Sequence, residues 1–177
     1  MREVSPVLYL VLLAGFLGWV AWQVFREVSR TRRQENVIRE LQPKLRKEQG
    51  SPEEYYELGS VYLEKRLYEQ AILQFKKAIA VAGEDIPPVC NALGFAYFAQ
   101  EQYDLAIRYY KSAVSAEPKY ATAWNNLGHA YEKKNLTGPA LEAYEAAIAS
   151  DPSNQLACRR AESLRKRITP SPSSSAS

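Results

Sequence analysis

The stretch that decides the fold is residues 93–113, LGFAYFAQEQYDLAIRYYKSA, because its pattern occurs three times in the chain. Each copy begins Leu-Gly-x-x-Tyr, has an alanine twelve residues after the glycine, an aromatic residue four positions later and a second alanine three positions after that. The glycines are Gly59, Gly94 and Gly128, which are 35 and 34 residues apart. A period of this length is typical of a solenoid built from pairs of helices, each burying its apolar face against the next.

The small residues of the repeat predict a close contact between the two helices of each unit. The glycines and the first alanines are expected to pack there: Gly59, Gly94, Gly128, Ala71, Ala106 and Ala140. Large side chains such as Leu58, Tyr62 and Phe75 are expected to fill the space around that contact. The predicted fold is therefore all-α, with three repeats over residues 51–154, divided as 52–85, 87–120 and 121–153.

A further helix is predicted over residues 155–168, after the last repeat. One side of it is apolar and the other is rich in arginine and lysine, as a helix that caps a solenoid requires. The apolar stripe consists of Leu156, Ala157, Ala161, Leu164 and Ile168. The segment that follows, residues 169–177, is of low complexity and is predicted to be disordered.

Residues 1–25 are predicted to be a membrane anchor. Residues 7–25 contain no charged side chain, and a helix of nineteen residues is about 28 Å long, close to the thickness of a hydrocarbon core. A cleaved signal peptide is the alternative, but no small-residue cleavage site follows the apolar run and the positive charge lies after it. We therefore expect the helix to be retained and to cross the membrane once.

Residues 26–50 are predicted to be a basic helical linker. From residue 26 to residue 47 there are eight basic and three acidic side chains, so the positive-inside rule places the body on the cytoplasmic or stromal side. Pro43 predicts a kink or a break near Gln42. Two interpretations of the basic residues stay open, contact with anionic lipid headgroups and a purely topological role.

The chemistry of the chain favours protein binding over catalysis. Cys90 and Cys158 are far apart in sequence, His129 is the single histidine, and neither a phosphate loop nor a hydrolase motif occurs. We predict no enzyme activity, no metal, no cofactor and no small-molecule substrate. Residues 51–154 carry nine basic and fourteen acidic side chains, so nucleic acid is not an expected partner either.

The three repeats resemble the tetratricopeptide repeat (TPR) family over residues 52–154. The resemblance implies a concave groove, with these positions facing a protein ligand: Tyr56, Ser60, Asn91, Phe95, Phe98, Asn125 and His129. The alternative is that several of them only pack between repeats. The positions at which some TPR proteins clamp a chaperone's terminal carboxylate carry no cation here, since they hold Tyr56, Ser60, Ala92, Thr122 and Asn126.

A narrower resemblance covers nearly the whole chain. Residues 41–65 (LQPKLRKEQGSPEEYYELGSVYLEK), 91–113, 124–134 (WNNLGHAYEKK) and 161–167 resemble the TPR-type photosystem I assembly factors of cyanobacteria and algal plastids. That resemblance implies a thylakoid anchor and contact with photosystem I subunits or assembly intermediates. Alternatives with the same architecture are an import receptor of an organellar outer membrane and a recruiting scaffold subunit of a membrane complex.

Overall fold

The computed structural model describes residues 6–168, which form eight helices and, within that range, no strand. The helices are α1 (Pro6–Lys47), α2 (Pro52–Glu64), α3 (Tyr68–Ala82), α4 (Pro87–Ala99), α5 (Tyr103–Ala116), α6 (Ala121–Lys133), α7 (Thr137–Ser150) and α8 (Gln155–Ile168). The prediction of an all-α solenoid behind a long apolar helix is confirmed. The tail predicted to be disordered, residues 169–177, lies outside the described residues, as do residues 1–5.

Each repeat is an antiparallel pair of helices that meet at a glycine. A Cβ atom added to Gly59 would lie 2.6 Å from the ring of Phe75, and one on Gly94 would lie 2.7 Å from the ring of Tyr110. At Gly128 the corresponding distance to Tyr144 is 3.0 Å. These contacts are shorter than ordinary van der Waals separation, so the aromatic ring of the second helix occupies the place of a side chain on the first.

The turns inside the three repeats have the same backbone geometry. Arg66, Glu101 and Asn135 have φ angles of 60°, 61° and 59°, although none of them is glycine. Each left-handed residue ends the first helix of its repeat and lets the second helix run back along it. The repeated turn therefore keeps the three helix pairs alike despite their different side chains.

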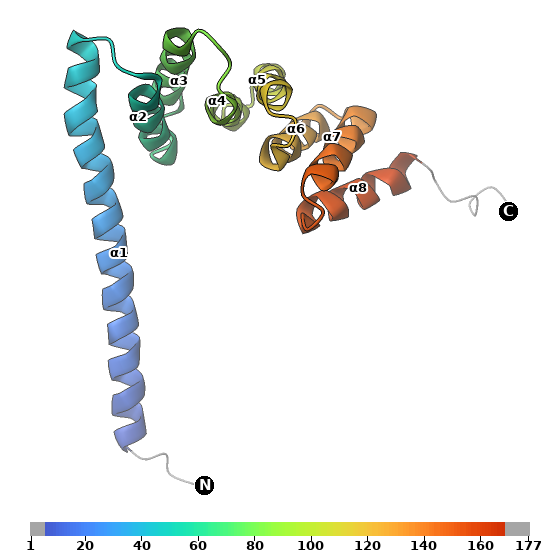
Figure 1. Cartoon of the computed structure of the whole chain (residues 1–177). Coiled ribbons are helices and arrows are strands. Elements are labelled where there is room, and N and C mark those ends of the chain that lie inside the picture. The colour runs from blue at the N-terminus through green and yellow to red at the C-terminus, as the bar shows by residue number, and fades with distance from the viewer. Residues whose placement is uncertain (1–5, 169–177) are drawn as a thin grey trace, which may run out of the picture.

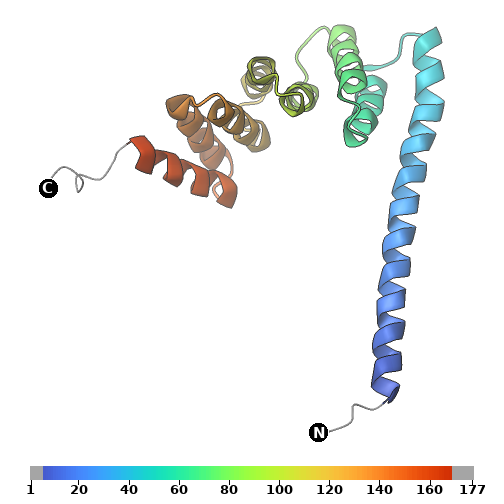
Figure 2. The same cartoon turned by 180° about the vertical axis from the view of Figure 1, so that it is seen from behind.

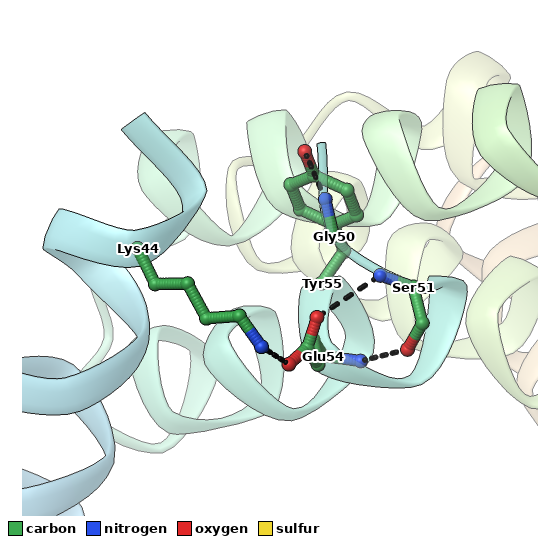
Figure 3. Close-up of polar contacts among 5 residues, drawn as sticks. All are labelled: Lys44, Gly50, Ser51, Glu54 and Tyr55. Carbon is green, nitrogen blue, oxygen red and sulfur yellow. Dashed lines mark hydrogen bonds and ion pairs between the residues drawn. The ribbon is translucent and has the colours of Figure 1, made fainter. Parts of the chain in front are cut away.

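The start of α2 is held by a group of polar contacts at its junction with α1 (Figure 3). Ser51 and Glu54 form a capping box, in which Ser51 Oγ accepts from the Glu54 amide and a Glu54 carboxylate oxygen accepts from the Ser51 amide. The same carboxylate pairs with Lys44 of α1, and the Gly50 amide donates to Tyr55 Oη. The helix start is thereby linked to the helix before it.

Helix α1 continues without interruption from the apolar segment to Lys47, so of the kink or break expected near Gln42 the break is absent. Pro43 lies close to the C-terminal end, where a missing amide donor removes only one hydrogen bond of the last turns. The adjacent side chains Leu41 and Leu45 are 8% exposed and belong to the repeat core, joined by half-buried Val37 and Ile38. Packing against α2 therefore supports the helix on both sides of the proline.

The molecule consists of a long rod and a curved body (Figures 1 and 2). The first part of α1 is long and apolar enough to cross a membrane, and its side chains are exposed, with Leu10 at 66% and Phe25 at 71%. The repeats and α8 leave the other end of the rod sideways. The body is therefore attached to the end of α1 that carries the basic residues.

Helix α8 closes the far end of the solenoid on α7. It buries Ala157, Ala161 and Leu164, which lie on one narrow stripe at spacings of four and three residues. Leu156 and Ile168, which the sequence assigned to the same stripe, are 50% and 48% exposed. The contact is narrower than predicted because small alanines on α8 let it approach α7 along a single line.

Candidate protein-binding groove

The inner side of the curved body is formed by α2, α4 and α6. Helix α4 contacts both α2 and α6, whereas α3, α5 and α7 do not pack on one another in this way. The first helices of the repeats are therefore closer together than the second helices, as on the concave side of a solenoid. Tyr56, Asn91, Phe95, Phe98, Asn125 and His129 all lie on these three helices.

A chain of polar contacts connects neighbouring repeats across this side. Asn126 Nδ2 donates to Asn91 Oδ1 at 2.9 Å, and Asn91 Nδ2 is 3.4 Å from Tyr120 Oη. Tyr56 also lies near Tyr120, and its ring centroid is 5.9 Å from that of Phe75. Asn91 and Tyr56 therefore make contacts within the protein. This agrees with the alternative that some predicted groove residues pack between repeats.

Phe98 and His129 form an aromatic contact between the second and third repeats. Their ring centroids are 4.7 Å apart, and Phe98 also meets the edge of Tyr103 at 5.3 Å. Burial lowers the pKa of His129, partly offset by the nearby Glu132 carboxylate, so the imidazole is neutral at pH 7. The pair thus offers a ligand an apolar surface with one polar edge.

Phe95 and Asn125 are the candidates best placed to contact a ligand, because Phe95 is exposed and Asn125 has an acceptor that is unpaired within the described part of the chain. The side chain of Phe95 is 46% exposed although it is aromatic and lies in the middle of α4. Asn125 Oδ1 is buried and accepts no hydrogen bond from any residue in the described range 6–168. A buried acceptor without a donor is uncommon in folded proteins, so this amide is suited to change rotamer and pair with a ligand.

Ser60 lies away from these residues, beside α1. It lines a cleft of about 600 Å³ between α1 and α2, together with Arg30, Arg33, Gln34, Val37, Glu57, Val61 and Glu64. Ser60 has the repeat position that is ligand-facing in the second and third repeats, but here α1 covers it, because α1 packs against the side of α2 that faces away from the second repeat. Sequence periodicity alone could not show this, since α1 lies outside the repeat.

Glu132 takes part in a contact that the periodic pattern does not indicate. Tyr144 Oη donates to Glu132 Oε2 at 2.7 Å, and Arg160 Nη1 of α8 lies 3.8 Å from Glu132 Oε1. Burial first, and then this hydrogen bond, raise the pKa of Tyr144. Glu132 therefore joins the third repeat to the capping helix. The sequence holds one sign of this contact: the third repeat has Tyr144, with a hydroxyl that needs a partner, where the first repeat has Phe75.

Within residues 6–168 the structure shows neither a reactive thiolate at Cys90 nor a grouped metal site. Burial, with the Asp85 carboxylate nearby, raises the pKa of the Cys90 thiol to about 12, so it is not a thiolate at pH 7. Among residues 6–168 no three His, Cys, Asp or Glu side chains are grouped as a metal site. What the groove provides is apolar area and amide groups, which suit a polypeptide ligand.

Comparison with known proteins identifies the class of protein first. Family models described as TPR repeat and tetratricopeptide repeat match residues 55–85, 94–135 and 121–154. The chain is therefore a TPR protein, a class whose fold ordinarily serves as a scaffold for binding other proteins.

Two relatives narrow the assignment. The chain is 36% identical over 140 residues to the uncharacterized protein ycf37 of Cyanophora paradoxa, covering 77% of this chain and 81% of that one. It is 38% identical over 163 residues to the tetratricopeptide repeat domain-containing protein PYG7, chloroplastic, of Arabidopsis thaliana. That match covers 90% of this chain and 54% of the length of PYG7. This chain belongs to the ycf37 family of TPR proteins, which confirms the predicted membership of the repeat family.

Solved structures agree on the fold. The crystal structure of MamA matches with a TM-score of 0.72 at 24% identity, covering 78% of this chain and 82% of that chain. The first TPR of Spaghetti (RPAP3), bound to an HSP90 peptide, matches with a TM-score of 0.63 at 20% identity, covering 68% and 95% of the two chains. At these identities the matches support the solenoid fold alone.

Proposed function

We propose that this chain is a membrane-anchored adaptor that binds protein segments on the concave side of its repeats and serves the assembly or stability of photosystem I in the thylakoid membrane. The observation that carries the proposal is the continuity of α1, in which one helix contains the apolar segment and also packs into the repeat core through Leu41 and Leu45. An anchored groove meets membrane partners at a high effective concentration without additional contacts. The photosystem itself comes from the resemblance to TPR assembly factors, and the chloroplastic relative supports it.

The groove favours a partner segment of particular chemistry. Phe95 offers exposed aromatic area, and Asn125 offers an acceptor that a backbone amide of the partner can satisfy. The repeats carry more acidic than basic side chains, which favours a basic or polar-aromatic segment. The residues proposed to face this partner are Tyr56, Phe95, Phe98, Asn125 and His129, with Asn91 behind them.

The orientation proposed for the chain has its body on the stromal or cytoplasmic side. Arg26, Arg30, Arg32 and Arg33 follow the apolar segment directly, and such residues remain on the side where translation occurs. Protease added to intact thylakoids or to their right-side-out vesicles would digest the body from the stromal side only. Protection of the body from stromal protease would contradict this orientation.

The partner is tested by affinity capture of the full-length tagged chain from detergent-solubilised thylakoids. We expect photosystem I subunits or assembly intermediates in the captured material and no catalytic activity in the purified chain. Replacing Phe95 by Ala should lower the recovery about fivefold or more, because a central aromatic contact is typically worth above about 1 kcal/mol. Leu73→Ala is the matched control, since Leu73 is 52% exposed on α3, outside the groove. Capture without photosystem I subunits, or equal recovery by both variants, would refute the proposal.

A further inference from the structure

The outer face of α8 carries cations that the repeats do not use. Arg160 and Arg165 are paired with Glu132 and Glu145 of the third repeat, at 3.8 Å and 2.7 Å. The remaining cations of the helix are Arg159, Lys166 and Arg167, which are exposed. Within residues 6–168 no carboxylate forms an ion pair with these three. Glu162 is the single acidic residue of α8, so its outer face is strongly positive.

This positive face stands out against the rest of the body. Residues 51–154 contain nine basic and fourteen acidic side chains, so the repeats have a net negative charge. A solenoid cap needs only a polar outer face to stay soluble, and serine, glutamate or glutamine would meet that need. The concentration of arginine and lysine at one end of an otherwise acidic body indicates an anionic surface as its partner.

Packing sets how the first repeat sits on α1. Helix α2 runs antiparallel to α1, since Glu54 pairs with Lys44 at one end and Glu64 lies 3.9 Å from Arg30 at the other. Leu41 and Leu45 of α1 belong to the same core as the repeats. The rod and the body are thus joined along a length of helix and not through a flexible linker.

Both views of the molecule place α8 on a particular level of the rod. The body leaves the C-terminal end of α1 and bends toward its N-terminal end, so that α8 lies level with the middle third of α1 (Figures 1 and 2). That part of α1 contains the change from the apolar side chain of Phe25 to the basic Arg26 and Arg30. If α1 crosses a membrane with its apolar segment, the lipid headgroups surround the part of α1 that follows Phe25, because the headgroup region extends about 5–7 Å beyond the hydrocarbon core. Helix α8 lies level with that part of α1 (Figure 1).

We propose that α8 docks through Arg159, Lys166 and Arg167 on the anionic lipid headgroups of the membrane that α1 spans. The solenoid then forms an arch with one end attached to the transmembrane helix and the other resting on the lipid surface, with its concave side toward the bilayer. This inference rests on the proposed membrane anchoring of α1 and is independent of which protein occupies the groove. The attraction acts only over about a Debye length, 8–10 Å, so it depends on the height of α8 above the bilayer.

The test measures the distance between α8 and the lipid surface in the full-length chain. The chain is reconstituted in nanodiscs of phosphatidylcholine, or of equal parts of phosphatidylcholine and phosphatidylglycerol. A donor dye is placed on Ser163→Cys with Cys158→Ala, because Cys90 is buried and does not compete for the label. An acceptor on the lipid headgroups reports docking by energy transfer. We expect high transfer in the anionic discs, and low transfer in the neutral discs or at high salt.

Variants that remove charge test whether the cations of α8 cause the docking on lipid. Near an anionic surface each cation contributes about fivefold to binding, so Arg159→Gln, Lys166→Gln and Arg167→Gln together should lower the ratio of docked to undocked molecules about a hundredfold. The matched control is Arg39→Gln, Arg46→Gln and Lys47→Gln, which removes equal charge at the end of α1 that is about 20–33 Å above the apolar segment. Circular dichroism checks that both variants remain folded.

Three results would overturn the proposal. One is equal transfer in neutral and anionic discs, and another is equal loss of transfer in the α8 variant and its control. The third is a chain that does not enter the discs, which would refute the membrane span and the docking together. Normal insertion without transfer refutes the docking alone, so the two failures are distinguishable.

Discussion

Gly59, Gly94 and Gly128 are the residues at which the two helices of each repeat come closest. The rings opposite them, Phe75 and Tyr110 among them, are at most 2% exposed and have no room to move. The paired alanines Ala71, Ala106 and Ala140 are completely buried. Because both partners are confined, even one added methyl group has to displace a ring or a helix.

We expect Gly94→Ala to lower the free energy of unfolding by about 1–3 kcal/mol, because its Cβ would lie 2.7 Å from two carbons of the Tyr110 ring. Thermal melting of the full chain in detergent, followed by circular dichroism at helical wavelengths, measures the change. Gly138→Ala is the control, since a Cβ there meets nothing within 4 Å. A Gly94→Ala chain as stable as the control would show that the helices separate easily at this contact.

His129 is expected to make the stability of the chain depend on pH. Burial lowers its pKa in the folded state, so the unfolded chain binds the proton more readily and stability falls as the pH decreases through the ordinary histidine value of about 6.5. The loss ends once the pH is below the lowered pKa. Melting temperatures of the wild type and His129→Gln, compared between about pH 7.5 and about pH 5, isolate this effect. An identical pH dependence in both chains would contradict it.

At the scale of elements, α1 combines two roles that are usually separate. Its N-terminal part is apolar and exposed on all sides, whereas Val37, Ile38, Leu41 and Leu45 near its C-terminal end pack on α2. It therefore covers the open face of the first repeat, as α8 covers that of the last one. One helix that contains the apolar segment and also caps the solenoid restricts the direction of the body, which a flexible tether would leave free.

Replacing Leu41 and Leu45 together by Ala should release α1 from the repeats. Each buried leucine shortened to alanine costs about 2–5 kcal/mol, and both losses fall on the α1–α2 contact. Hydrogen exchange should accelerate in residues 34–47 and in α2 while α4 and α5 remain protected. Leu136→Ala, at a leucine that is 42% exposed, is the control. Unchanged exchange in α1 would mean that these leucines do not hold it.

At the scale of the whole molecule, the length of α1 beyond the apolar segment sets the height of the groove above the bilayer in the proposed membrane-anchored state. Residues 26–47 continue the helix for about 33 Å, and α2 returns along it toward the apolar end. The groove can therefore be reached by parts of a neighbouring membrane protein that project from the bilayer.

Inserting the seven residues Ala-Glu-Ala-Ala-Lys-Ala-Ala between Val28 and Ser29 should raise the body by about 10 Å and rotate it by only about 20°, because seven residues are nearly two helical turns. We expect energy transfer from α8 to the lipid and capture of photosystem I subunits to fall, while resistance to carbonate extraction is unchanged. The same insertion after Ile168 leaves the height as it was and serves as the control. Equal behaviour of the two insertions would show that height is unimportant.

Much of the fold could be predicted from the sequence because the repeat is locally encoded. The period of the glycines and the Ser51-Pro52 start of α2 each depend on neighbours within one helix pair. The candidate groove could be predicted only in part. The position of Ser60 beside α1 and the bond from Asn126 to Asn91 depend on helices that are distant in sequence.

The sequence by itself determined an all-helical solenoid, an apolar N-terminal helix and a basic segment between them, because helix periodicity, caps and hydrophobicity are properties of short stretches. Only the tertiary structure decided that α1 is unbroken at Pro43, that Glu132 joins Tyr144 and Arg160, and that α8 lies level with the middle third of α1. Those features depend on small angles between successive helix pairs, which add up along the body and are set by how whole side chains pack.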